Sequence, residues 1–143
     1  MVGYSGTPLA KKLGLKEQHL IAVLNAPDGF IDGTDFPMGC NVQEKLGKVP
    51  LDVVICFVTL KAQLQAAFPK AAARLKPEGG LWIAWPKLSA RKKGGPNSDM
   101  TEDAVRAVAF PQGFVDNKVC AIDDVWSGLR CVLRIENRPK RKL

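Results

Sequence analysis

The fold is decided by residues 50–86, PLDVVICFVTLKAQLQAAFPKAAARLKPEGGLWIAWP. Two short apolar runs, LDVVICFV (51–58) and LWIAWP (81–86), are typical of parallel strands that helices cover on both faces. Between them, apolar residues recur at helical spacing and predict a helix whose stripe is Leu60, Leu64, Ala67, Phe68, Ala71, Ala72 and Leu75. The segment predicts a parallel strand–helix–strand unit, with a kink or restart at Pro69 and a turn at KPEGG (76–80).

Shorter elements are predicted before this unit. Thr7 and Pro8 favour the start of a helix, and Gly14 favours its end. The apolar run over residues 19–24 predicts the first strand. Glycines and prolines are so frequent over residues 25–51 that this segment leaves room for only one brief strand, near residues 40–45.

The residues after this unit predict a loop, a helix and a hairpin. Residues 87–100 are polar, and either Asp99 or Thr101 is suited to cap a helix that runs towards Phe110. Residues 117–123 and 129–135 alternate in polarity and predict two antiparallel strands, joined by a loop over residues 124–128.

This order of elements resembles the second half of a Rossmann-like methyltransferase that uses S-adenosylmethionine (SAM). The resemblance implies a three-layer α/β fold, methyltransferase-like, with a short, mainly parallel sheet and a C-terminal antiparallel hairpin. The chain departs from the usual Pro-Gly-Gly turn because Glu78 follows Pro77.

A second resemblance covers nearly the whole chain. It is carried by the phrases GYSGTPLAKKLG (3–14), LDVVICFV, GGLWIAWPK (79–87), TED (101–103) and DNKVCAIDDVWSGLR (116–130). Together they resemble a small bacterial family known as domain of unknown function 3052. This resemblance implies no reaction and no catalytic residues.

The composition fits one globular core. With 143 residues, of which 46% are hydrophobic, the chain predicts a single α/β domain over residues 1–137 and a basic C-terminal tail over residues 138–143. No apolar run approaches the roughly 20 residues that cross a bilayer, and the first residues lack the apolar segment of a secretory signal. We therefore expect a cytoplasmic protein without a membrane partner.

The net charge of +7 is concentrated in two basic runs, Arg91, Lys92 and Lys93 in the loop and Arg138, Lys140, Arg141 and Lys142 in the tail. Short runs between glycines and prolines are typical of solvated surface, which is the interpretation we favour. The alternative is that both runs contact nucleic acid, although neither contains an aromatic residue for stacking on bases.

The four cysteines predict buried free thiols. Cys40, Cys56, Cys120 and Cys131 form no Cys-x-x-Cys pair and have no histidine nearby, so they indicate neither a zinc site nor a redox dithiol. Cys120 and Cys131 can lie near each other across the predicted hairpin, but a disulfide there would be unusual in a reducing cytosol.

In this fold class a cofactor lies at the carboxyl ends of the parallel strands. The candidate cofactor-binding residues there are Asn25, Asp28, Gly29, Trp85 and Lys87. Methyltransferases have a Gly-rich turn after the first strand, whereas residues 25–29 contain one glycine and a proline without an N–H donor. Glu44 alone resembles the acid that binds a ribose. We therefore expect no cofactor.

Other candidate chemistry is sparse. His19 is the only histidine and has no predicted nucleophile or acid beside it, and the spacing of Asp28, Asp32 and Asp35 suits turns rather than a calcium loop. We therefore predict no catalytic residue and no metal ligand. Trp82 and Trp85 should point to opposite faces of the sheet, and Trp85 either lines a cleft with Trp126 or caps an edge of the core.

These observations lead to a hypothesis and two alternatives. The leading hypothesis is a non-catalytic binding or regulatory domain on a degenerate methyltransferase-like scaffold. The first alternative is a small-ligand or nucleotide (SAM-type) binding protein or enzyme, and the second is a nucleic-acid contact through the basic loop and tail. The partner is not defined by the sequence, and an exposed outer strand can allow self-association.

Overall fold

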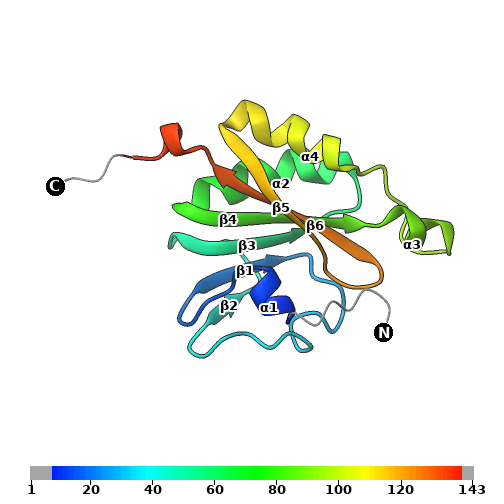
Figure 1. Cartoon of the computed structure of the whole chain (residues 1–143), viewed down its shortest axis with the longest axis horizontal. Helices are drawn as coiled ribbons and strands as arrows, with labels where there is room; N and C mark the ends of the chain where they lie inside the picture. Colours follow the sequence, from blue (N-terminus) through cyan, green and yellow to red (C-terminus); the bar gives the residue numbers. More distant parts are fainter. Residues whose placement is uncertain (1–7, 140–143) are drawn as a thin grey trace.

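A six-stranded sheet forms the centre of the molecule in the computed structural model, which describes residues 8–139 (Figure 1). The strand order is β2-β1-β3-β4-β6-β5. The first four neighbours, β2 (Asn41–Gln43), β1 (Leu20–Leu24), β3 (Leu51–Phe57) and β4 (Leu75–Pro86), pair in parallel. The hairpin strands β5 (Phe114–Ala121) and β6 (Trp126–Leu133) add antiparallel pairs. The predicted mainly parallel α/β sheet with a C-terminal antiparallel hairpin is confirmed.

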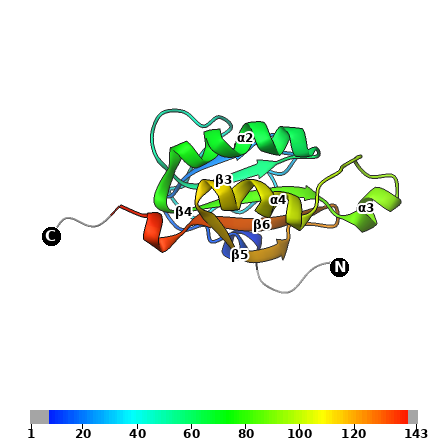
Figure 2. The same cartoon turned by 90° about the horizontal axis from the view of Figure 1, so that it is seen from above.

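Two helices cover one face of this sheet (Figure 2). α2 (Lys61–Arg74) buries Leu64, Phe68 and Ala71 there, and α4 (Glu102–Ala109) buries Val105 and Ala109. Thr101 caps α4 by accepting a hydrogen bond from the Ala104 N–H, as one of the two predicted caps. The layer with regular helices therefore lies on one side only.

The other face is covered by α1 (Leu9–Lys12) and the irregular segment between β1 and β2. The Trp82 indole N–H donates to the Leu13 carbonyl at 2.9 Å, and the Lys118 ammonium donates to the Lys12 carbonyl at 2.6 Å. These bonds hold the short helix on the sheet. Pro8 precedes α1 as its cap instead of occupying the first helical position, while Thr7 lies outside the described residues.

The α2 helix is continuous, so the predicted restart at Pro69 is wrong. Pro69 removes one hydrogen bond to the Gln65 carbonyl, but both residues are exposed and water can satisfy that carbonyl. The start of α2 is fixed by the Gln63 side chain, whose oxygen accepts from the N–H groups of Thr59 and Leu60 at 2.8 and 3.1 Å.

The predicted turn at KPEGG is also wrong, because α2 passes directly into β4. The register jumps from Leu51–Leu75 to Val53–Gly80, so the extra residues bulge from the strand. A Cβ on Gly79 would lie 2.9 Å from the Asp52 carbonyl oxygen, and a Cβ on Gly80 would lie 2.5 Å from Arg130 Nε. Gly79 is therefore needed for space, because the Asp52 backbone is fixed in the sheet, whereas the Arg130 side chain can move away from a side chain at position 80.

The C-terminal half also differs in detail from the sequence prediction. The predicted polar loop contains α3 (Leu88–Lys92), and the hairpin strands begin three residues earlier than predicted. A 3-10 turn, η1 (Phe110–Gln112), joins α4 to β5, and another, η2 (Ile135–Asn137), follows β6. None of the helices formed by residues 8–139 is long and apolar enough to cross a membrane.

Cys120 and Cys131 do not face each other. Cys120 is opposite Gly128 and Cys131 is opposite Asp116, and the two thiols pack into different hydrophobic clusters on the two faces of the sheet. All four cysteines are free. Their predicted proximity is therefore wrong, because the earlier start of β6 changes the register of the hairpin.

Candidate functional site

The parallel strands β1, β3 and β4 all end at one edge of the sheet, here called the carboxyl edge. β6 runs in the opposite direction, so the hairpin loop before Trp126 reaches the same edge. Two pockets open there, one beside the loop after β1 and one beside the segment after β4. β3 lies between β1 and β4, which sets these strands roughly 10 Å apart.

The pocket beside β1, here called the acidic pocket, has a volume of about 250 Å³. It is lined by Ala26, Pro27, Asp28, Gly29, Ile31, Asp32 and Glu44. Glu44 follows β2 directly, and because β2 pairs in parallel with β1, its carboxylate comes to the end of β1. Residues separated by 12 positions or more thus meet in one cavity.

Tight turns replace a helix in the wall of the acidic pocket. The Phe30 N–H donates to the Pro27 carbonyl at 3.1 Å, and the Gly33 N–H donates to the Gly29 carbonyl at 2.9 Å. Gly29 has φ +80°, a left-handed conformation that favours glycine. Among the described residues, no backbone acceptor binds the N–H groups of Asp28 and Gly29. The loop therefore has two N–H groups that can donate to a ligand, although residues 25–29 contain only one glycine.

The charge of the acidic pocket is negative. Asp28, Asp32 and Glu44 are exposed, and within residues 8–139 no ion pair neutralises them. Carboxylates repel a phosphate group, whereas they accept hydrogen bonds from hydroxyls and attract cations. The pocket is thus suited to a hydroxyl-bearing ligand that is neutral or positively charged.

The second pocket, here called the basic pocket, has a volume of about 450 Å³. Its walls are Lys87, Ser89, Ala90, Lys93, Gly94, Gly95, Asp124 and Val125. The Lys87 N–H donates to the Val125 carbonyl at 2.7 Å and so joins the segment after β4 to the hairpin loop. This pocket carries two lysines and one carboxylate.

Arg91 holds the wall of the basic pocket together. Its guanidinium donates to the Pro86 carbonyl at 3.0 and 2.7 Å, to the Met100 carbonyl at 2.7 Å and to the Ser98 carbonyl at 3.3 Å. The interpretation of Arg91 as a solvated residue is therefore wrong: its donors are used to close the loop over residues 87–100. Lys92 and Lys93 are exposed.

The predicted cofactor residues do not form one pocket. Asp28 and Gly29 line the acidic pocket with Asn25 next to them in the chain, and Lys87 lines the basic pocket. Trp85 is only 5% exposed and packs in the core under α2 and α4. Trp126 lies on the other face, 5.1 Å from Phe57 between ring centroids. A cleft lined by both tryptophans is therefore excluded, while Trp82 and Trp85 do face opposite ways.

The loop run on α3 and Arg138 of the tail run lie at opposite ends of the described part of the chain (Figure 1). α3 carries Lys92 at the carboxyl edge, whereas Arg138 follows η2 near the far end and donates from Nε to the Leu133 carbonyl at 3.1 Å. Lys140, Arg141 and Lys142 lie outside the described residues. One continuous surface does not join the loop run to Arg138.

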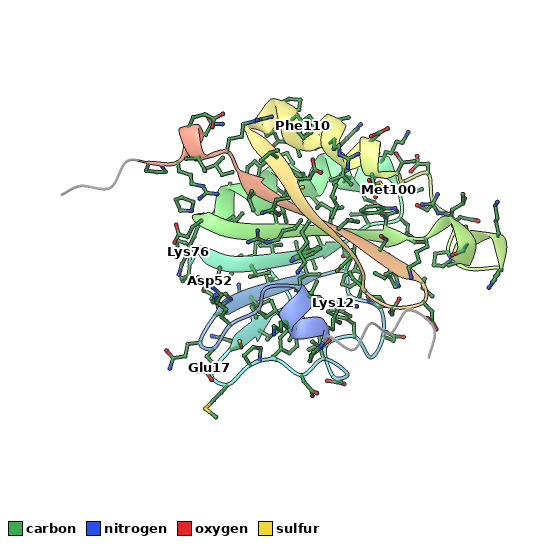
Figure 3. All side chains as sticks on the ribbon, in the orientation of Figure 1. Lys12, Glu17, Asp52, Lys76, Met100 and Phe110 are labelled. Atoms are coloured by element: carbon green, nitrogen blue, oxygen red, sulfur yellow. The ribbon has the colours of Figure 1, made fainter. Side chains whose placement is uncertain are left out.

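The opposite, amino edge holds an ion pair and the single histidine. Asp52 accepts from the Lys76 ammonium and from the Leu20 N–H, each at 2.8 Å, and Figure 3 shows this pair far from Met100. Burial opposes ionisation of Asp52, but these hydrogen bonds prevail and lower its pKa. His19 precedes β1 and its Nδ1 accepts from the Lys16 N–H at 3.2 Å, so it lies away from both pockets.

Comparisons with known proteins now define the fold. No protein-family model matches the chain, and no curated protein matches it in sequence. A solved SAM-dependent methyltransferase from Aquifex aeolicus is similar with a TM-score of 0.62 and 17% identity, over 86% of each chain. The chain has a methyltransferase-like fold. The Methanococcus jannaschii fibrillarin pre-rRNA processing protein is similar with a TM-score of 0.59 and 16% identity, over 87% of this chain and 73% of that one.

A third structure with this methyltransferase-like fold is the magnesium protoporphyrin IX methyltransferase of Synechocystis with bound SAH. Its TM-score is 0.53 at 14% identity, over 82% of this chain and 75% of that one. Structural similarity at identities this low shows the fold alone, so the chemistry must be argued from the residues of the site.

Sequence reasoning missed parts of both pockets. The spacing of Asp32 predicts only a turn, and no sequence pattern marks Ser89 or Asp124 as site residues. The signals for the acidic pocket are the positions of Asp28 and Gly29 after the first strand and of Glu44 after a short second strand.

Proposed function

We propose that this protein binds a SAM-type nucleoside in the acidic pocket and does so without catalysing a reaction. The observation that carries the proposal is the position of Glu44, at the end of β2 and beside the Asp28–Gly29 turn. In nucleoside-binding sheets of this kind an acidic residue at the end of the second strand accepts from the ribose hydroxyls. The methyltransferase-like fold supports this placement.

The charge of the pocket selects among nucleosides. Asp28, Asp32 and Glu44 disfavour the phosphates of ATP, whereas SAM carries a sulfonium and an ammonium group. The N–H groups of Asp28 and Gly29, which have no backbone acceptor within residues 8–139, are available for its carboxylate. SAM should therefore bind more tightly than its demethylated product, which lacks the sulfonium charge, and ATP should not bind.

The absence of catalysis is inferred from the side chains at the carboxyl edge. His19 lies at the other edge, and Cys56 is fully buried with its pKa raised to about 11 by burial. The ionisable side chains that line the acidic pocket are thus the carboxylates of Asp28, Asp32 and Glu44, and we assign them to ligand binding rather than to activation of an acceptor. We include in this proposal that the protein is a bacterial member of the family it resembles, domain of unknown function 3052. We also include that it is cytoplasmic.

Isothermal titration with SAM, its demethylated product and ATP tests the binding. We expect heat from the two adenosyl compounds and none from ATP. The Glu44→Gln variant should bind SAM about 10-fold more weakly, since a hydrogen bond to a charged group contributes about 1.5 kcal/mol or more. Glu17→Gln is the matched control, because Glu17 is exposed at the amino edge, and it should bind like the wild type (Figure 3).

Two results would contradict the proposal. Absence of heat with both adenosyl compounds would show that the protein binds neither of them. Equal affinities of Glu44→Gln and wild type would show that Glu44 does not hold the ligand. Transfer of a labelled methyl group from SAM to RNA or protein of a cell extract would contradict the non-catalytic part alone.

A further inference from the structure

The lysines of the basic pocket are not neutralised. Within residues 8–139, ion pairs shorter than 4.0 Å involve only the cations of Lys76 and Arg106. Lys87, Lys92 and Lys93 thus keep their charge for a ligand. Asp124 is the one carboxylate among the lining residues, so the lining has an excess of one positive charge and Lys92 beside it adds another.

The walls of this pocket are fixed before any ligand arrives. Arg91 ties the segment to the Pro86, Ser98 and Met100 carbonyls, and Asp123 accepts from the N–H groups of Val125 and Trp126 at 2.8 Å. Preorganised walls reduce the entropic cost of binding.

The glycine N–H groups of the pocket are already used, whereas its side-chain donors are not used by any described residue. The N–H groups of Gly94 and Gly95 already donate to the Arg91 and Ala90 carbonyls, at 3.3 and 2.8 Å. The side-chain donors of the pocket are the Lys87 and Lys93 ammoniums and the Ser89 hydroxyl. Two ammoniums and a hydroxyl are the donors that proteins use on phosphate oxygens.

We propose that the basic pocket binds the sugar–phosphate backbone of single-stranded nucleic acid, with Lys87 and Lys93 on phosphates and Ser89 as a further donor. A volume of about 450 Å³ is within the range of ligand sites and exceeds what one phosphate needs. Leu88 is 61% exposed beside the two donors Lys87 and Ser89 and offers an apolar contact for a sugar or base.

The charge distribution favours a single strand over a duplex. A duplex presents phosphates along a wide face, whereas the loop lysines and Arg138 lie at opposite ends of the molecule (Figure 1). A single strand can follow one narrow groove with two or three phosphate contacts. The interaction requires neither Arg138 nor the tail residues after it, and it does not rest on the nucleoside site.

Fluorescence anisotropy with a labelled single-stranded RNA of mixed sequence, and with its DNA counterpart, tests the proposal over a range of salt concentrations. Each phosphate contact to a single strand contributes about 0.7 to the slope of log affinity against log salt. The Lys87→Gln/Lys93→Gln variant should therefore lower the magnitude of that slope by about 1.4, and weaken binding about tenfold at low salt.

A matched control removes the same charge elsewhere. Lys48 and Lys70 are exposed and lie towards the amino edge, so Lys48→Gln/Lys70→Gln should change the affinity by less than about twofold. A chain ending at Pro139 should also retain binding. Urea unfolding of each variant checks that the fold is intact.

Several outcomes would overturn the proposal. These are no binding of either oligonucleotide, an equal loss in the control pair, loss only on removal of residues 140–143, or equal competition by polyglutamate. The SAM titration, repeated on Lys87→Gln/Lys93→Gln, should match the wild type. Failure of nucleic-acid binding is thereby distinguished from failure of the nucleoside site.

Discussion

The Arg91→Met substitution should destabilise the protein far more than its place in a basic run suggests. Arg91 donates to three backbone carbonyls through hydrogen bonds of 2.7 to 3.3 Å. Methionine keeps much of the aliphatic volume of the side chain and removes every donor. The substitution therefore tests the hydrogen bonds rather than the packing.

The expected magnitude follows from which carbonyls can be rehydrated. Pro86 and Met100 are buried, so their carbonyls lose a partner without gaining water, whereas Ser98 is half-buried and its carbonyl can be hydrated. Each buried group left unsatisfied costs about 1–3 kcal/mol. Because Arg91 is itself half-buried, we take the lower part of this range and expect a loss of about 2–4 kcal/mol in the free energy of unfolding.

Urea unfolding monitored by tryptophan fluorescence measures this loss. Lys92→Met is the matched control, because Lys92 is the next residue, is exposed and makes no side-chain hydrogen bond within the described part of the chain. It should change stability by less than about 0.5 kcal/mol. A loss within that same limit for Arg91→Met, or equal losses in the two variants, would contradict this expectation.

Two further predictions concern ionisable groups in the core and at the amino edge. Asp52→Asn should lower the free energy of unfolding by about 1 kcal/mol at pH 7. Because the pKa of Asp52 is lowered on folding, this contribution is lost as pH falls through the pKa of the folded state. Urea unfolding at pH 7, 5 and 3 should therefore show the difference in stability from the wild type shrinking. A deficit that is independent of pH would contradict this account. Burial raises the pKa of Cys56 to about 11 and of Cys131 to about 12, so native protein at pH 8 should react with Ellman's reagent only through other thiols, and Cys131→Ala should leave that reaction unchanged. A slower native reaction in this variant would show that Cys131 is accessible.

Periodic segments predicted the fold well. The apolar runs 51–58 and 81–86 became the central strands, and the stripe through Leu64, Phe68 and Ala71 is the buried face of α2. Local pattern determined these elements because their burial is continuous along the chain. The glycines of KPEGG predicted a turn, because a sequence does not show that the backbone of the neighbouring strand leaves no room for a side chain at Gly79.

The site was harder to predict because its contacts are distant in sequence. Glu44 was found through a strand pattern, but its meeting with Asp32 depends on the pairing of β1 with β2. The role of Arg91 depends on carbonyls at both ends of a loop, for which no spacing rule exists. Trp126 was assigned to a loop, whereas a start of β6 three residues earlier places it in the sheet, facing away from Trp85.

The position of β6 between β4 and β5 has a consequence for the ribosome-bound chain. β5 leaves the exit tunnel before β6, yet it has no neighbour in the finished sheet until β6 has been translated. During this interval no paired strand holds Phe114 in the hydrophobic cluster that it shares with α4. When residues up to Val125 have emerged from the tunnel of an arrested ribosome, the parallel strands should therefore be able to associate while β5 is still sensitive to protease.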